Sequence, residues 1–190
     1  MSVIDRLLWR TFGRPRGLLG RLGGRILARG KGEVTEWVIS GLDLRPTDRV
    51  VEVGFGPGLG VRLAAAAVPE GFVAGVDYSE VMVEQARARN AAAVEDGRVD
   101  LRYGSADDLP FADAAFDGAF SINSMQTWPD AAAGLRELHR VLKPGGRLAL
   151  AFTPVAGQST DELRPLLSEA GFGEIRIEER DGDVRALATK

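Results

Sequence analysis

Glycines occupy every second position in the run Gly54-Phe55-Gly56-Pro57-Gly58-Leu59-Gly60, between a short apolar segment and a segment with helical spacing. Glycine permits positive φ and lets the backbone approach a ligand closely. The free N–H groups at the start of a helix favour an anionic group. In an open α/β sheet such a loop lies at the carboxyl ends of the strands, where ligands bind. The run therefore predicts a small-molecule site with an anionic group beside the helix start.

Other uses of a glycine-rich loop match this run less well. The nicotinamide fingerprint GxGxxG requires a glycine at the position of Leu59 or of Val61, depending on where it starts. A P-loop requires a lysine followed by serine or threonine, and neither is present. A plain tight turn without a ligand is the remaining alternative.

Side chains for several other kinds of chemistry are missing from the 190 residues. There is no cysteine and a single histidine, His139, which excludes thiolate nucleophiles, disulfides and multi-histidine metal sites. We expect no bound metal and a structural role for His139. No apolar run reaches the roughly 18 residues of a membrane span. The absence of cysteine is compatible with a reducing cytosol, and we expect a cytoplasmic protein.

Strand-like and helix-like segments alternate from about Arg49 onward. Strands are predicted at 49–53, 72–77, 99–103, 116–122 and 147–152. Helices are predicted at 59–68, at 80–87 with Ser79 as the N-cap, and at 130–142 with Pro144-Gly145-Gly146 as the stop. This alternation is typical of a parallel sheet with helices on both faces. After a helix over 160–170, residues 174–179 and 184–188 flank the turn signal Asp181-Gly182, which predicts an antiparallel hairpin added to the sheet.

The first 45 residues carry a basic excess, whereas the rest of the chain is acidic. Apolar groups and frequent glycines in this segment predict a helical lid or cap, with a helix at 33–42 leading into the first strand. The basic groups would suit peripheral contact with an anionic membrane or an acidic substrate. A solvated basic face over the acidic body is the alternative that we favour.

Five segments, in order and at family spacing, resemble class I S-adenosylmethionine-dependent methyltransferases, in particular the ubiquinone/menaquinone-biosynthesis-like enzymes that act on small molecules. Residues 50–58 resemble motif I, an acid followed by GxGxG. The other matching segments are 75–86, 104–117, 121–128 and 137–146, the last of which reads Glu-Leu-His-Arg-Val-Leu-Lys-Pro-Gly-Gly. Together the segments cover about residues 46–152.

The resemblance implies an α/β Rossmann-like three-layer sandwich with a mostly parallel seven-stranded sheet and a C-terminal antiparallel hairpin. We predict a lid at 1–45 and a methyltransferase domain at 46–190. The implied activity is transfer of a methyl group from S-adenosylmethionine, which leaves S-adenosylhomocysteine as the product.

The resemblance also assigns the residues around the methionine part of the cofactor. Glu52 would face the ammonium group, directly or through water. Gly54, Gly56 and Gly58 would line the methionine portion, where backbone N–H groups can meet its carboxylate. Phe55, inside the same loop, is counted with them, and Asn123 would lie beside the methionine portion and the incoming acceptor.

At the nucleoside end, Asp77 would accept hydrogen bonds from both ribose hydroxyls. Tyr78 would pack on the adenine, and Met82, in the same matching segment, is counted with the cofactor-binding residues. Ser105 and Ala106 would meet the adenine edge. Family members often carry an acid where this chain has Ser105, so here the pair is assigned together.

Methyl transfer from a sulfonium is an SN2 displacement, which needs alignment and exclusion of water more than a base. If the acceptor must lose a proton, Asp130 and Tyr103 are the candidate bases. We expect a small, lipophilic acceptor, in a pocket lined by four aromatic residues. These are Trp9, Phe12, Trp37 and Trp128.

Several alternatives stay open at this stage. The chain could be a non-catalytic cofactor-binding module, a dimer partner of an active enzyme, or a nicotinamide-dependent oxidoreductase. An RNA methyltransferase using the basic start is a further alternative. The stretch Asn123-Ser124-Met125-Gln126 lacks the proline-proline-aromatic motif of amino-methylating nucleic-acid enzymes, which argues against a nucleic-acid substrate. A homodimer is compatible with the sequence.

Overall fold

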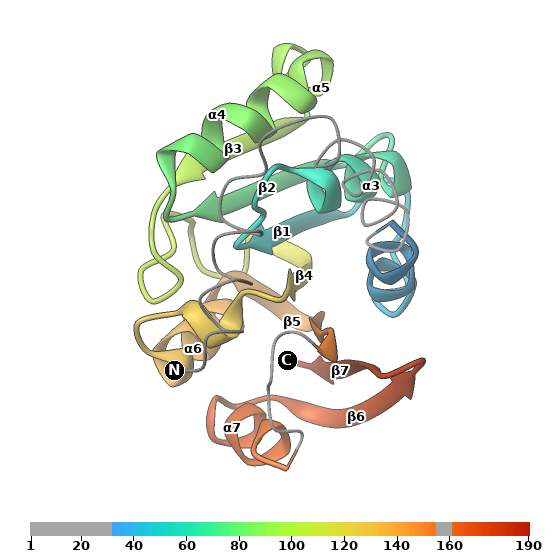
Figure 1. Ribbon diagram of the computed structural model, residues 1–190, viewed down its shortest axis with the longest axis vertical. Coiled ribbons are helices and arrows are strands. Elements are labelled where there is room, and N and C mark those ends of the chain that lie inside the picture. The colour runs from blue at the N-terminus through green and yellow to red at the C-terminus, as the bar shows by residue number, and fades with distance from the viewer. Residues whose placement is uncertain (1–31, 155–160) are drawn as a thin grey trace, which may run out of the picture. The chain divides into compact units, whose positions relative to one another are not determined.

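The computed structural model describes residues 32–154 and 161–190 (Figure 1). Thr35–Lys190 form one compact unit, through which a sheet runs in the order β3-β2-β1-β4-β5-β7-β6. The strands are β1 (Arg49–Val53), β2 (Phe72–Asp77), β3 (Val99–Tyr103), β4 (Phe116–Ile122), β5 (Leu142–Phe152), β6 (Gly173–Arg180) and β7 (Asp183–Thr189). The predicted seven-stranded Rossmann-like sheet is thereby confirmed.

Strands β1 to β5 are mutually parallel, whereas β7 is antiparallel to both of its neighbours, β5 and β6. The turn between β6 and β7 has positive φ at both Asp181 (54°) and Gly182 (87°). Two central residues with positive φ match the twist of the flanking strands, which is why Asp-Gly is favoured in two-residue hairpins. The predicted C-terminal hairpin is confirmed, and β7 lies inside the sheet while β6 forms its edge.

Two groups of helices form the outer layers of the sandwich. The helices are α3 (Leu59–Ala67), α4 (Glu80–Arg89), α5 (Ala91–Glu95), α6 (Ala131–Val141) and α7 (Leu163–Glu169), with a 3-10 turn η1 (Met125–Thr127). Helices α3 and α4 pack together and against β1 to β3, and α6 and α7 pack together and against β5 and β6. Ser79 caps α4 as predicted, because its hydroxyl accepts a hydrogen bond from Met82 N at 3.4 Å.

The segment from Thr35 to β1 packs within this compact unit. Residues 32–40 are helical, and Val38 and Leu42 are buried. Residues 1–31, with Trp9, Phe12 and most of the predicted basic lid, lie outside the described residues.

Strand β5 begins earlier than predicted. The Pro144-Gly145-Gly146 stretch was expected to stop the preceding helix and separate it from the strand, but it is part of β5. Its backbone pairs with the chain end: Gly145 N donates to Lys190 O, and Lys190 N donates to Gly146 O, both at 2.9 Å. The pairing partner lies at the far end of the chain, so local sequence could not indicate it.

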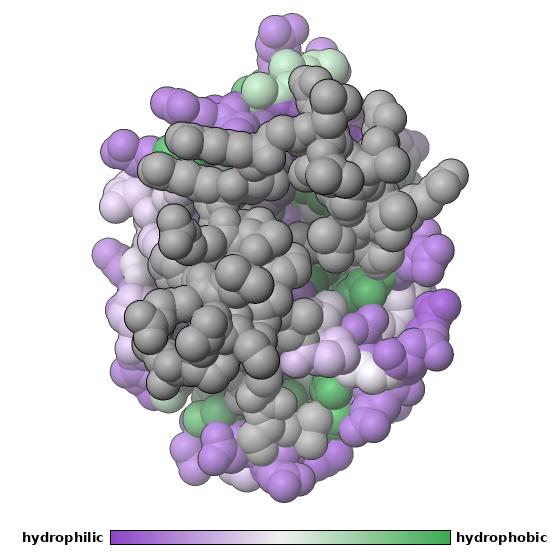
Figure 2. All heavy atoms as spheres, in the orientation of Figure 1, coloured by the Kyte–Doolittle hydropathy of each residue, from purple (hydrophilic) through white to green (hydrophobic). Residues whose placement is uncertain are grey.

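The surface of the described part is largely polar. The described residues around the margin of Figure 2 are mostly hydrophilic, with smaller hydrophobic areas between them. Large exposed hydrophobic side chains are Tyr78, Val81 and Tyr103. Within residues 32–154 and 161–190, no helix combines the length and the apolar character needed to cross a membrane.

Candidate cofactor-binding and active site

The glycine loop between β1 and α3 has the backbone geometry that its composition predicts. Gly54, Gly56 and Gly58 have φ of 74°, 51° and 78°, which disfavours other residues. A Cβ atom on Gly54 would overlap the Ser124 side chain, and one on Gly58 would lie 2.7 Å from Ala86 Cβ. A Cβ on Gly56 would meet nothing within 4 Å. Gly54 and Gly58 therefore permit close packing, whereas Gly56 faces open space.

Asp77, at the end of β2, holds the glycine loop in place. Its Oδ2 accepts a hydrogen bond from Gly56 N at 2.8 Å, and its Oδ1 accepts one from Ser79 N at 2.9 Å. The residue is buried. Because each carboxylate oxygen can accept two hydrogen bonds, both oxygens retain capacity for a ligand.

Glu52 on β1 is a buried carboxyl, only 3% exposed. It lies against the start of α3, since a Cβ on Gly60 would overlap its Oε1. Burial raises the pKa of Glu52 well above its usual value, the backbone N–H of Val61 opposes this, and the charge of Asp77 adds to it. Its Oε2 has no hydrogen-bond partner within the described part of the chain. A buried acceptor of this kind is suited to a cationic or N–H group of a ligand.

A pocket opens where these strands end. The lining residues come from the ends of β1 to β3 and from the segment after β4. They are Val53, Gly54, Val76, Asp77, Tyr78, Gly104, Ser105, Ala106, Ser124, Thr127, Trp128 and Pro129. The structure therefore brings together six predicted site residues that are scattered along the sequence, and these are Gly54, Asp77, Tyr78, Ser105, Ala106 and Trp128.

One side of the pocket is the turn after β3. Ser105 Oγ donates a hydrogen bond to Asp107 Oδ1, and Ser105 and Asp108 form an isolated backbone bridge. Ala106 is buried, whereas Tyr78 is 67% exposed at the rim. The turn thus presents backbone and a small side chain to the pocket, and an aromatic ring stands beside it.

The opposite side is formed by the segment after β4. The indole Nε1 of Trp128 donates to Ser124 Oγ at 2.9 Å. A Cβ on Gly134 of α6 would lie 2.5 Å from the Trp128 ring, so only glycine allows the ring to lie this close to the helix. The sequence singled out Trp128, whereas Pro129 was not predicted as a lining residue. In the sequence, the only indication that the Trp128 ring packs closely against α6 is the glycine at position 134 within that helix.

Other predicted site residues do not line this pocket. Phe55 belongs to the glycine loop, and its side chain is buried against Gly75 of β2. A Cβ on Gly75 would lie 2.6 Å from Phe55 Cδ1. Met82 lies on the first turn of α4. Asn123 has a φ of 52°, and its Oδ1 accepts a hydrogen bond from Thr153 N at 2.8 Å, which ties β4 to the end of β5. Trp37 lies against Arg185 of β7, whose Cζ is 4.5 Å from the indole centroid.

The two candidate bases also lie outside the pocket lining. Asp130 Oδ1 accepts a hydrogen bond from Ala133 N at 2.9 Å and caps α6. Tyr103, at the end of β3, is 61% exposed. No group of three or more potential metal ligands occurs among the described side chains. The geometry is that of a binding site without an evident proton-transfer group.

A family model described as a methyltransferase domain matches residues 51–150, which is more than half of the chain and contains all of the lining residues. The chain belongs to the class I S-adenosylmethionine-dependent methyltransferases. Its cofactor is accordingly S-adenosylmethionine.

Similar proteins support the methyltransferase family. An uncharacterized methyltransferase of Bacillus subtilis is 29% identical over 165 residues, covering 83% of this chain and 89% of that protein. A demethylmenaquinone methyltransferase of Symbiobacterium thermophilum is 43% identical over 104 residues, covering 54% of this chain and 41% of that protein. The crystal structure of a SAM-dependent methyltransferase from Aquifex aeolicus shares the fold, with a TM-score of 0.73 at 24% identity, over 82% of this chain and 88% of that one.

The chain spans between 41% and 60% of the length of several curated relatives that it matches. These relatives therefore contain sequence beyond the region that they share with this chain.

The residues present in this methyltransferase fit S-adenosylmethionine. Among the described residues Glu52 Oε2 has no partner and is suited to an ammonium group, and a Cβ on Gly56 would meet no described atom within 4 Å, which leaves room for a ligand beside the backbone. Asp77 retains acceptor capacity for a diol, and Tyr78 offers an exposed aromatic face. The ammonium group, the ribose and the adenine ring of the cofactor are thus matched by groups of suitable chemistry.

Proposed function

We propose that this methyltransferase methylates a small, lipophilic acceptor beside the wall formed by Ser124 and Trp128. The observation that carries the proposal is the position of Trp128, whose ring lines the same pocket as Asp77 and Ala106. The hydrogen bond to Ser124 and the close packing against Gly134 of α6 fix the position of the indole. A fixed aromatic wall favours an apolar acceptor.

The methionine part of the cofactor is assigned to the ends of β1 and β4. Glu52 accepts from the ammonium group through its free Oε2, directly or through water. Gly54, Gly56 and Gly58 offer backbone N–H groups beside the carboxylate, at the positive end of α3. Asn123 supports the methionine part indirectly, because its side-chain Oδ1 already accepts a hydrogen bond from Thr153 N.

The nucleoside part is assigned to the ends of β2 and β3. Asp77 accepts from the ribose hydroxyls with the lone pairs that Gly56 and Ser79 leave free. Tyr78 packs on the adenine face. Ser105 and Ala106 meet the edge of the adenine with backbone groups, and the Ser105 hydroxyl is held by Asp107.

Bound S-adenosylmethionine supplies an activated methyl group on a sulfonium that leaves as a neutral thioether. The protein's own part is to bind the acceptor in line with the methyl–sulfur bond and to exclude water. Asp130 caps a helix and Tyr103 faces solvent, so the proposal assigns no base. This suits an SN2 reaction, in which a base is needed only for acceptors that must lose a proton.

The charge of the pocket favours a small molecule over a nucleic acid. None of the described lining residues is a lysine or an arginine, so a phosphate-rich acceptor would find no countercharge there. The name of the Symbiobacterium relative also points to a small-molecule acceptor for that protein. The sequence also predicts Trp9 and Phe12 for the acceptor pocket, and both lie outside the residues that the structure describes.

Calorimetry with S-adenosylmethionine and S-adenosylhomocysteine tests the cofactor site. We expect the wild type to bind both, Asp77→Asn to bind at least about tenfold more weakly, and NADH to give no signal. Asp96→Asn, which removes an exposed carboxylate paired with Arg98 at 3.9 Å, is the matched control and should not change the affinity. A wild type that binds neither cofactor form would contradict the assignment.

An acceptor screen then tests the substrate class. Labelled methyl groups should appear on lipophilic phenols, amines or acids and not on RNA. Preferential, salt-sensitive methylation of RNA would overturn the small-molecule proposal. Tight cofactor binding without transfer to any acceptor would favour a non-catalytic module instead.

A further inference from the structure

The connection from β3 to β4, residues 104–115, crosses the sheet without a helix. In the strand order β3-β2-β1-β4 it must pass two strands before β4 begins at Phe116. A crossover of this kind is usually an α-helix, which satisfies its own backbone hydrogen bonds. A crossover without a helix needs partners for its N–H and C=O groups from elsewhere.

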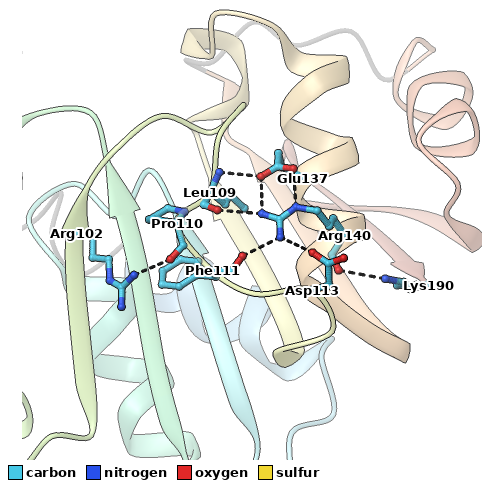
Figure 3. Close-up of polar contacts among 8 residues, drawn as sticks. All are labelled: Arg102, Leu109, Pro110, Phe111, Asp113, Glu137, Arg140 and Lys190. Carbon is cyan, nitrogen blue, oxygen red and sulfur yellow. Dashed lines mark hydrogen bonds and ion pairs between the residues drawn. The ribbon is translucent and has the colours of Figure 1, made fainter.

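The side chain of Arg140 on α6 supplies partners for two of the carbonyl groups (Figure 3). Its Nη2 donates to Leu109 O at 2.9 Å, and its Nη1 donates to Phe111 O at 2.8 Å. Nη1 also pairs with Asp113 Oδ1 at 2.7 Å. One guanidinium group therefore fastens three positions of the crossover to α6.

Glu137, one turn earlier on α6, completes the arrangement. Its Oε1 and Oε2 accept from Arg140 Nε and Nη2, both at 2.7 Å, and Oε2 also accepts from Leu109 N at 2.8 Å. Leu109 thus has its N–H bound by Glu137 and its C=O bound by Arg140, while its side chain is buried. We call Glu137 and Arg140 together the crossover clamp.

A second arginine holds the crossover from the side of β3. Arg102 Nη1 donates to Pro110 O at 2.6 Å, and its Cζ lies 4.9 Å from the centroid of the Phe111 ring. The Phe111 ring in turn packs edge-on against Phe116, with 5.1 Å between centroids. Residues 109–113 are therefore held from both sides of the crossover.

The clamp is continuous with the adenine side of the pocket. Ser105 and Ala106 line the pocket, and the turn that contains them is closed by the bridge between Ser105 and Asp108. Leu109 follows directly, so its position determines where this short, closed turn lies. A shift at Leu109 would move Ser105 and Ala106 relative to the pocket.

We propose that Glu137 and Arg140 are positioning residues for the cofactor, which hold the crossover so that Ser105 and Ala106 meet the adenine. The inference rests on the proposed adenine contact of these two residues. Neither clamp residue lines the pocket, so both act through the backbone of Leu109.

The geometry explains why an arginine is needed. The guanidinium group presents several N–H donors in one plane. In Arg140 these donors bind the Glu137 carboxylate in a bidentate manner and also reach the carbonyl oxygens of Leu109 and Phe111. A lysine would keep the charge but offers a single nitrogen. Arg140→Lys therefore tests geometry separately from charge.

Calorimetry on the full chain compares S-adenosylhomocysteine with S-inosylhomocysteine, which carries an oxygen in place of the 6-amino group of adenine. We expect the wild type to prefer S-adenosylhomocysteine. Arg140→Lys should bind it about tenfold more weakly and lose most of this preference. Arg147→Lys is the matched control, because Arg147 also pairs with an aspartate and a carbonyl, Asp43 and Leu42 O, and does not line the pocket.

The preference between the two ligands separates positioning from general stability. A clamp that merely stabilises the fold would lower the Tm and leave the ratio of the two affinities unchanged, and that result in folded Arg140→Lys overturns the inference. If Arg140→Lys does not fold, Glu137→Gln, which keeps the shape of the side chain, carries the same test.

The remaining outcomes are also decisive. A wild type that binds both ligands equally overturns the inference, because there is then no adenine contact to position. A wild type that binds neither ligand contradicts the proposed cofactor site itself, so the two failures can be told apart.

Discussion

Single residues in this methyltransferase do more than their motif indicates. The family resemblance implies that Glu52 and Asp77 both face the cofactor. The structure adds that Asp77 already binds Gly56 N and Ser79 N, whereas Glu52 keeps an oxygen without a partner in the described structure. Asp77 therefore stabilises the glycine loop in addition to its proposed contact with the cofactor. Glu52 has an oxygen that can accept a hydrogen bond from a ligand.

Glu52 should make the cofactor-free protein sensitive to pH. Burial raises its pKa above the usual 4.5, so the unfolded chain releases this proton at a lower pH than the folded protein does. The contribution of Glu52 to stability is therefore fully present below the unfolded pKa and is lost as the pH rises through the folded pKa. Glu52→Gln stays neutral, so without cofactor its Tm should exceed that of the wild type at pH 8 but match it near pH 4.

The same substitution should weaken binding of S-adenosylmethionine, because a neutral amide replaces the partner of the ammonium group. Thermal unfolding at both pH values and calorimetry at pH 8 measure the two effects. Glu84→Gln, at an exposed position on α4, is the control. A Glu52→Gln protein with unchanged stability and unchanged affinity would show that the free oxygen has no part in the site.

At the scale of elements, the glycine loop was the most predictable feature. Its place between β1 and α3 and its positive φ values follow from composition and spacing. What differs among its glycines is what each one faces, and this comes from other elements. Gly54 is pressed against Ser124, which follows β4, whereas Gly56 faces open space.

Alanine substitutions should separate these two kinds of glycine. Gly56→Ala should cost about 1–2 kcal/mol for the left-handed backbone alone, because its Cβ would meet no atom of the described residues within 4 Å. Its main effect should be weaker cofactor binding, since the methyl group enters the space assigned to the ligand. Gly54→Ala should cost about 1–3 kcal/mol more, because its Cβ overlaps the Ser124 side chain.

Denaturant unfolding and calorimetry of the two variants test this difference. In Gly54→Ala with Ser124→Gly, the nearest Ser124 atom to the new methyl group is Cα at 3.8 Å, so part of the stability should return. Ser124→Gly alone is the reference for the lost Trp128 hydrogen bond. Equal losses of stability in Gly54→Ala and Gly56→Ala would contradict the packing argument.

Other elements show where local patterns stop being sufficient. The helix of residues 131–141 and its cap at Asp130 follow from spacing and residue type. The extension of β5 through Pro144-Gly145-Gly146 does not, because it depends on pairing with Lys190 at the end of the chain. Likewise, the run from Gly104 to Phe111 identifies the family but does not show that Arg140 fastens it.

For the whole molecule, the compact unit Thr35–Lys190 contains every described residue of the cofactor pocket. A chain without residues 1–31 should therefore fold and bind S-adenosylhomocysteine with an affinity within about threefold of the full chain. At a hundred times its Kd, this ligand should add about 2.7 kcal/mol to the stability of either form. For a chain of this size that is a rise in Tm of about 5–10 °C.

Methyl transfer should respond differently to the same truncation. Because the sequence predicts Trp9 and Phe12 for the acceptor pocket, the shortened chain should bind cofactor but lose activity toward the acceptor. Differential scanning fluorimetry with and without S-adenosylhomocysteine, followed by an activity assay, measures both. Full activity in the shortened chain would remove the lid from the proposal.

The resemblance of five segments identified the family. The sequence by itself also determined the order of strands and helices and the glycine loop. These features depend on periodicity, glycine spacing and caps, which act over a few residues of chain. The tertiary structure alone decided that Glu52 Oε2 has no partner among the described residues, that the Trp128 ring packs against Gly134, and that Arg140 binds Leu109, 31 positions away. Such contacts join segments that come together only once the sheet has formed. The pattern of residue types along the chain does not show which distant segments will be neighbours in space.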